Sequence, residues 1–62
     1  MAQHAHHTSE AEEMYLITIA RAVEDGHPEP VPVSLVAREL DVSAVSANQM
    51  VRKLAGRNYV EY

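Results

Sequence analysis

The stretch that decides the fold is SLVARELDVSAVSANQ, which runs from Ser34 to Gln49. It contains two helix starts separated by one short turn. Ser34 is a residue type that caps a helix, the break beginning at Asp41 ends that helix, and Ser43 caps a second one. The apolar positions of the first helix, which we expect to face inward, are Leu35, Val36, Ala37 and Leu40. Two helices joined in this way are typical of a helix-turn-helix.

The second helix of this pair, expected over residues 43–57, has the composition of a helix that reads DNA. It contains no acidic residue, and its polar side chains gather near its start, where a recognition helix meets base edges. Asn and Gln suit adenine because each can donate and accept one hydrogen bond, and Val45 can contact a thymine methyl group. The cations lie farther along and are expected to contact phosphates. The candidate DNA-binding residues are Ser43, Val45, Ser46, Asn48, Gln49, Arg52 and Lys53, with Arg57 as a further cation. A solvated polar helix face is the alternative interpretation.

Composition and charge limit the classes of function. The chain has 62 residues, enough for one small domain, and it has no cysteine to form a disulfide or a thiolate metal site. The net charge is -4, yet residues 1–31 hold six acids and one cation, whereas residues 42–58 hold three cations and no acid. Only one face is therefore attractive to phosphate. No signal peptide and no apolar run of roughly 20 residues is present, so we expect a cytoplasmic protein.

The first eight residues are polar and show no periodicity, so we interpret residues 1–8 as a disordered tail and residues 9–62 as the folded domain. The tail is rich in histidine, which can bind a divalent metal weakly, but nothing in the sequence fixes a ligand geometry. These histidines are His4, His6 and His7.

A first helix is expected to begin after Ser9, because Glu12 three positions later completes a capping box. The helix is expected to end near Gly26. Its apolar residues recur at helical spacing, which indicates a helix packed on a core. The predicted stripe consists of Leu16, Ile17, Ala20 and Val23, broadened by Ile19.

The remaining segments complete a winged helix-turn-helix pattern. Residues 26–32 contain three prolines and form a stiff connector. In the last helix, the inward stripe is expected to consist of Met50, Val51 and Leu54. Asn58 can end that helix in the left-handed conformation, and residues 59–62 alternate like a strand before the sequence stops. The predicted fold class is therefore mainly α, a three-helix winged helix-turn-helix with an incomplete wing strand at its C-terminus.

No arrangement of side chains predicts an enzyme. Glu12 and Glu13 are adjacent, but neighbouring helical positions point about 100° apart and no nucleophile accompanies them. A solvated helix face explains this pair. The sequence contains no Ser-His-Asp arrangement, zinc signature or nucleotide-binding loop.

Three segments taken together carry a family resemblance: EEMYLITIARAVEDG (12–26), VSLVARELDVSAVSANQMVRKL (33–54) and YVEY (59–62). The chain resembles the N-terminal winged-helix domain of the iron-dependent repressors, the diphtheria-toxin-repressor and manganese-transport-regulator family. The resemblance implies a metal-activated, dimeric transcription regulator that binds double-stranded DNA. It assigns the DNA-contacting positions to Ser43, Val45, Ser46, Asn48 and Gln49.

The resemblance also implies a metal cofactor, Fe²⁺ or Mn²⁺. Met14 matches a methionine of the activating metal site in iron-type members. Manganese-type members carry acidic ligands at positions that are Met14 and Ile17 here, so the match favours the iron-type site. In the family the other ligands and the dimerisation helices lie downstream, so the chain looks like a truncated member. A single thioether is a weak ligand for divalent iron, and we expect Met14 alone to hold no metal.

The main hypothesis is thus a DNA-binding domain of a metal-dependent repressor, which reads a palindromic operator through its third helix when two copies form a homodimer. The alternative is a protein-interaction winged helix without DNA binding, whose acidic first helix and exposed strand edge bind a partner. The net charge of -4 supports that alternative. A third hypothesis is a small metal-binding protein that uses the His-rich tail, and deletion of residues 1–8 tests it.

Overall fold

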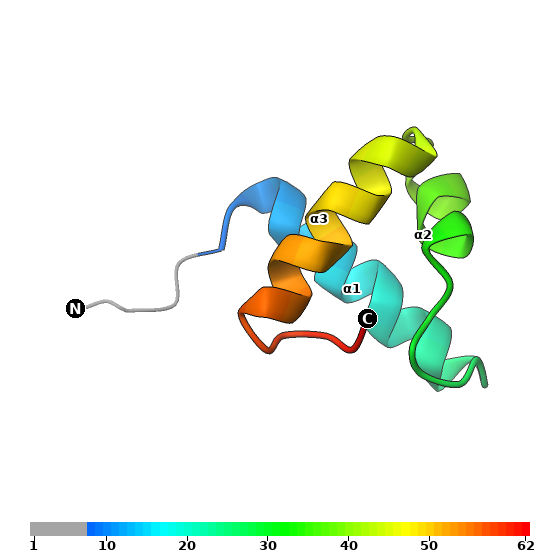
Figure 1. Cartoon of the computed structure of the whole chain (residues 1–62). Coiled ribbons are helices and arrows are strands. Elements are labelled where there is room, and N and C mark those ends of the chain that lie inside the picture. The colour runs from blue at the N-terminus through cyan, green and yellow to red at the C-terminus, as the bar shows by residue number, and fades with distance from the viewer. Residues whose placement is uncertain (1–7) are drawn as a thin grey trace.

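A computed structural model of the chain describes residues 8–62 and is shown in Figure 1. These residues form three helices, α1 (Glu10–Glu24), α2 (Val33–Leu40) and α3 (Ala44–Gly56), and each helix contacts the other two. The mainly α fold class is confirmed. A disordered tail was predicted for residues 1–8, with weak metal binding by its histidines. Residues 1–7 lie outside the described residues. No helix within residues 8–62 is long and apolar enough to cross a membrane.

The predicted start of α1 is confirmed in detail. The Ser9 Oγ accepts a hydrogen bond from the Glu12 backbone N–H at 3.1 Å, and the Glu12 Oε1 accepts one from the Ser9 backbone N–H at 2.9 Å. This reciprocal pair is the capping box. The helix ends at Glu24, and Gly26 follows with φ 101°, a left-handed conformation that suits glycine.

The predicted inward face of α1 is right for Ile19 and Leu16, which belong to the core or pack against it, and wrong for Ile17, Ala20 and Val23. The buried residues are Glu12, Tyr15, Ile19 and Ala22, whereas Ile17 is 54% exposed and Val23 is 37% exposed. Ala20 is also exposed, and Leu16 is only partly buried. The reason is that apolar residues surround almost the whole helix, so their periodicity does not select one face. Packing against α2 and α3 selects the face that contains Tyr15 and Ile19.

The turn between α2 and α3 follows the prediction, but the start of α2 does not. Ser34 does not cap α2, because the helix begins one residue earlier with Pro32 as its N-cap. Pro32 already has the extended geometry of a cap, with φ -60° and ψ 135°. Asp41 ends α2 in the left-handed conformation with φ 56°, and the Ser43 Oγ caps α3 by accepting from the Ser46 backbone N–H at 3.0 Å.

The core lies where the three helices meet. Its largest fully buried side chains are Val36 of α2 and Val51 and Leu54 of α3. Other members of the buried cluster are Tyr15, Ile19, Ala22, Val31, Ala37 and Ala47. The predicted inward stripes of α2 and α3 are confirmed, since their remaining members pack against this cluster while partly buried: Leu35, Leu40 and Met50.

The segment after α3 turns back toward the rest of the domain, as Figure 1 shows. Asn58 has φ 65°, which confirms the predicted left-handed helix end. Tyr59 and Val60 pack partly buried against the core. The predicted strand over residues 59–62 is not confirmed, because residues 8–62 contain no strand. A strand requires hydrogen bonds from a second strand, and the described part of the chain does not supply one.

Candidate nucleic-acid interface

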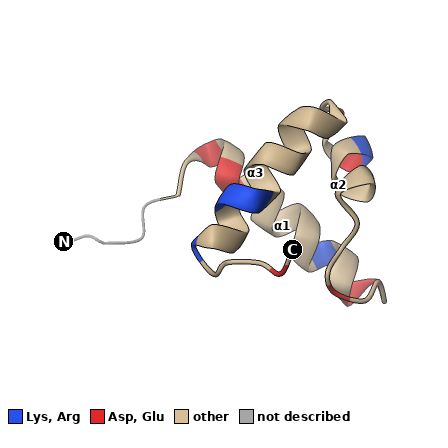
Figure 2. Cartoon of the chain, in the orientation of Figure 1, with Lys and Arg blue, Asp and Glu red and all other residues tan. Residues whose placement is uncertain are grey.

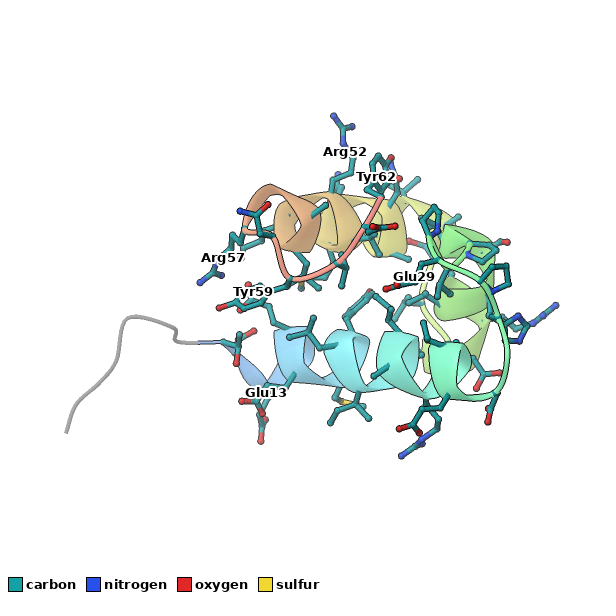
Figure 3. All side chains as sticks on the ribbon, turned by 90° about the horizontal axis from the view of Figure 1, so that it is seen from below. Glu13, Glu29, Arg52, Arg57, Tyr59 and Tyr62 are labelled. Atoms are coloured by element: carbon teal, nitrogen blue, oxygen red, sulfur yellow. The ribbon has the colours of Figure 1, made fainter. Side chains whose placement is uncertain are left out.

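The exposed face of α3 brings together most of the residues predicted to bind DNA. Val45, Gln49 and Arg52 are spaced i, i+4 and i+7, so they project from one side of the helix. Ser46 and Lys53 lie beside them, and all five residues are exposed. Arg52 points away from α1 in Figure 3. Val45 is 68% exposed although it is apolar, so its side chain contributes nothing to the core and is available to a partner.

The first turn of α3 adds hydrogen-bonding groups to this face. The Ser43 hydroxyl donates to the Ser46 Oγ at 3.0 Å while its oxygen caps the helix. The Ser46 hydroxyl therefore keeps its own proton for an external acceptor. No acidic residue lies in this turn, so the partial positive charge of the helix N-terminus is not neutralised there. The arrangement suits a phosphate or a base acceptor.

Asn48 departs from the exposed face. It is half-buried on the flank of α3. Its Oδ1 accepts a hydrogen bond from the Tyr62 hydroxyl at 2.7 Å. The sequence pattern grouped Asn48 with Gln49, but adjacent helical positions point about 100° apart. Asn48 therefore has a protein partner from the C-terminal segment, whereas the Gln49 side chain makes no hydrogen bond within residues 8–62.

Lys53 of α3 and Arg57, the residue that follows α3, meet a buried carboxylate of α1. The Glu12 Oε2 lies 2.9 Å from the Lys53 Nζ and 3.4 Å from an Arg57 guanidinium nitrogen, and the Glu12 side chain is only 4% exposed. Arg57 also stacks over the Tyr59 ring, 5.3 Å from its centroid. In Figure 2 the acidic start of α1 lies next to the basic part of α3. Sequence reasoning placed Glu12 in the capping box and, with Glu13, on a solvated helix face. The solvated face is wrong for Glu12, which is buried because α3 packs over it, and right for the exposed Glu13. The contact of Glu12 with the basic residues was missed.

The hydrogen bond from Lys53 is the largest cause that lowers the pKa of Glu12 below its ordinary value, and the bond from the Ser9 backbone adds to it. Burial of the carboxylate acts in the opposite direction and is outweighed. Glu12 therefore remains charged and ties the start of α1 to the end of α3. Lys53 is anchored at one side, but its side chain is still 57% exposed and can reach a phosphate. Arg52 forms no ion pair with any of residues 8–62.

Comparison with known families agrees with this geometry. The family described as iron dependent repressor, N-terminal DNA binding domain, matches residues 7–62. The chain belongs to this family. No curated protein and no solved structure matches the chain. The family consists of DNA-binding transcription regulators rather than enzymes, so the predicted family, the DNA-binding function and the repressor class are confirmed.

The side chains described in this iron-dependent repressor domain do not form a complete metal site. Met14, matched by resemblance to a metal ligand, is 57% exposed on the outer face of α1. Within residues 8–62 no three His, Asp or Glu side chains come together in a group that can hold a metal ion. One thioether is too weak a ligand to hold divalent iron by itself.

We expect the charge of Glu12 to make the stability of this repressor domain pH-dependent. Because its pKa is lowered on folding, ionised Glu12 stabilises the folded state above the ordinary value of 4.5, and this contribution is lost as the pH falls through the folded-state pKa. Glu12→Gln keeps the capping-box pattern but removes the charge. At neutral pH the variant should be less stable than the parent chain, and the difference should shrink as the pH is lowered below 4.5.

Urea unfolding followed by circular dichroism at several pH values measures this difference. Glu13→Gln is the matched control, because it removes the same charge from the exposed neighbouring position. The control should leave the pH dependence close to that of the parent chain. An equal effect of both substitutions would contradict a specific role of the buried carboxylate.

Proposed function

We propose that residues 9–62 form a domain that binds operator DNA by inserting α3 into the major groove. The observation that carries this proposal is the exposed face of α3, which combines Val45, Gln49 and Arg52 and has no acidic residue. A protein with net charge -4 needs such a local region to approach a polyanion. The helix start leads into the groove in helix-turn-helix proteins, and here that start carries the Ser46 hydroxyl, which accepts from Ser43 and keeps its own proton for an external acceptor.

The residues of this face have different proposed roles. Gln49 reads a base edge, since its amide matches the donor and acceptor of adenine, and Val45 contacts a thymine methyl group. Ser43 and Ser46 contact a phosphate or a base near the helix start. Arg52 and Lys53 are farther along α3 and neutralise phosphates. Lys53 does so while Glu12 holds its ammonium group from the other side. Asn48 is a candidate DNA contact from the flank of the helix.

We propose that metal dependence and recognition of a symmetric operator require the assembled repressor. Two copies related by a two-fold axis place two α3 helices in successive major grooves, so the operator is a palindrome and the active form is a homodimer. The family is iron-dependent, and Met14 contributes one ligand of the Fe²⁺ or Mn²⁺ site. The other ligands come from groups outside the described residues. In this proposal, DNA binding by α3 is regulated through dimer formation and metal binding.

Fluorescence anisotropy with a palindromic A·T-rich duplex and a scrambled duplex, measured over a range of salt concentrations, tests the DNA-binding proposal. The chain should prefer one duplex and bind both more weakly as salt increases. Equal affinity for both duplexes at every salt concentration would remove the support for a base-reading helix. Addition of Fe²⁺ or Mn²⁺ to this chain should not change the affinity, because residues 8–62 offer no complete metal site.

Substitution of Arg52 should weaken binding without changing sequence preference. Arg52→Ala removes one proposed phosphate contact, so we expect the same loss of affinity for both duplexes and a decrease of the salt slope by about one. Arg21→Ala is the matched control, since it removes an exposed cation from α1. The control should leave the slope nearly unchanged because exposed charges are screened beyond about 10 Å at moderate salt. Equal slopes for the two variants would contradict a phosphate contact of Arg52.

A protein-interaction module is the second candidate function. The observation that favours it is the exposed apolar pair on α1, where Met14 is 57% and Ile17 is 54% exposed. Acidic residues Glu10 and Glu13 lie on the same helix. Absence of binding to either duplex at low salt would favour this module over DNA recognition.

A further inference from the structure

The C-terminal segment of the described chain contacts the helix that we propose to read DNA. Tyr62 is 60% exposed, and its hydroxyl donates to the Asn48 Oδ1 at 2.7 Å. Figure 3 shows Tyr62 and Arg52 on the same side of α3, the side away from α1. The hydrogen bond joins positions 14 residues apart, and both partners lie at the surface. It therefore forms at the edge of the proposed DNA-binding face.

This hydrogen bond constrains what Asn48 can offer to a base. An asparagine side chain has one acceptor oxygen with two lone pairs and an NH₂ group with two donors. Adenine recognition in the major groove uses both, because the amide oxygen accepts from N6 while the NH₂ group donates to N7. The Tyr62 hydroxyl occupies one of the two lone pairs of Oδ1 and holds this oxygen toward the C-terminal segment, so the NH₂ group is the part of the amide that points elsewhere. Held in this way, Asn48 presents donors, which match the O6 and N7 acceptors of guanine.

We propose that Tyr62 is a specificity-determining positioning residue, which fixes the Asn48 amide so that it donates to guanine in preference to adenine. This inference rests on the proposed DNA-binding function of α3. Tyr62 acts through Asn48 and needs no contact of its own with a base. The sequence pattern favoured adenine for Asn48, and the partner from the C-terminal segment reverses that preference.

The test begins with selection of bound sequences from a pool of random duplexes, followed by affinity measurements on the best duplex and its single-base-pair variants. The base pair read by Asn48 is the one whose preference disappears in Asn48→Ala. Tyr62→Phe keeps the ring and removes only the hydroxyl. At that base pair, Tyr62→Phe should reduce the preference for guanine over adenine by roughly 2- to 10-fold, the effect of one ordinary hydrogen bond.

A double-mutant cycle separates a positioning role from a direct contact. In the Asn48→Ala background, Tyr62→Phe should have no further effect on base preference. Circular dichroism melting of each variant verifies that the fold is retained. An unchanged ratio of affinities for guanine and adenine in Tyr62→Phe overturns the inference. A uniform loss of affinity in Tyr62→Phe that persists in the Asn48→Ala background overturns it too. An Asn48→Ala variant that keeps every base preference of the parent chain has the same consequence. If the parent chain binds no duplex, the proposed function fails together with the inference.

Discussion

Leu54→Ala is expected to unfold most of the domain. Leu54 is completely buried at the junction of the three helices. Truncation of a buried leucine costs about 2–5 kcal/mol, because apolar contacts are lost and a cavity remains. A core in a domain of this size rarely supplies more than about 3–5 kcal/mol of net stability. The cost is therefore comparable with the whole free energy of unfolding, and circular dichroism should show loss of helix at 25 °C or a far lower urea midpoint.

Val45→Ala is the control for this prediction. It also removes apolar groups from α3, but Val45 is 68% exposed and alanine is the better helix former. Its stability should stay within about 0.5 kcal/mol of the parent chain. Similar urea midpoints for the two variants would show that Leu54 does not lie at the centre of the core.

The fold was predictable where local chemistry determines the backbone. Ser9 and Ser43 each cap a helix, because the serine Oγ accepts a hydrogen bond from the backbone N–H three residues later. The residues that give this signal lie within one helical turn of each other in the sequence. Ser34 carries the same hydroxyl but fails as a cap, because Pro32 has already fixed an extended conformation two positions earlier. The face of α1 was not predictable, since the helix is apolar almost all round and only packing distinguishes Ile19 from Ile17.

The candidate site was predictable along α3 and unpredictable across elements. Val45, Gln49 and Arg52 share a face because of helical spacing, which the sequence contains in full. The contact between Arg57 and Glu12 joins positions 45 residues apart, and no local pattern indicates it. From the sequence alone, a glutamate at position 12 is interpreted as a cap residue, because its second role depends on the packing of α3 beside it. The partners of the α3 side chains therefore had to come from the tertiary structure.

Gln49→Ala is expected to remove most of the sequence preference in DNA binding. Gln49 lies at the middle of the exposed face, one turn after Val45 and beside the cations. Because its amide has no hydrogen-bond partner within residues 8–62, both its donor and its acceptor are available to a base. A good bidentate contact of this kind discriminates between bases by about 1–3 kcal/mol, which corresponds to roughly 5- to 150-fold in affinity. Affinity ratios for the preferred and scrambled duplexes measure the loss.

Arg52→Ala is the comparison variant for Gln49→Ala. Both substitutions truncate an exposed side chain of α3, but only the arginine carries charge. If α3 reads bases, Gln49→Ala reduces the ratio between the duplexes while its salt slope stays that of the parent chain, and Arg52→Ala does the reverse. If Gln49→Ala instead weakens both duplexes equally, Gln49 contacts the backbone and base reading must come from other residues. The base preference at the Asn48 position would then carry the specificity of the helix.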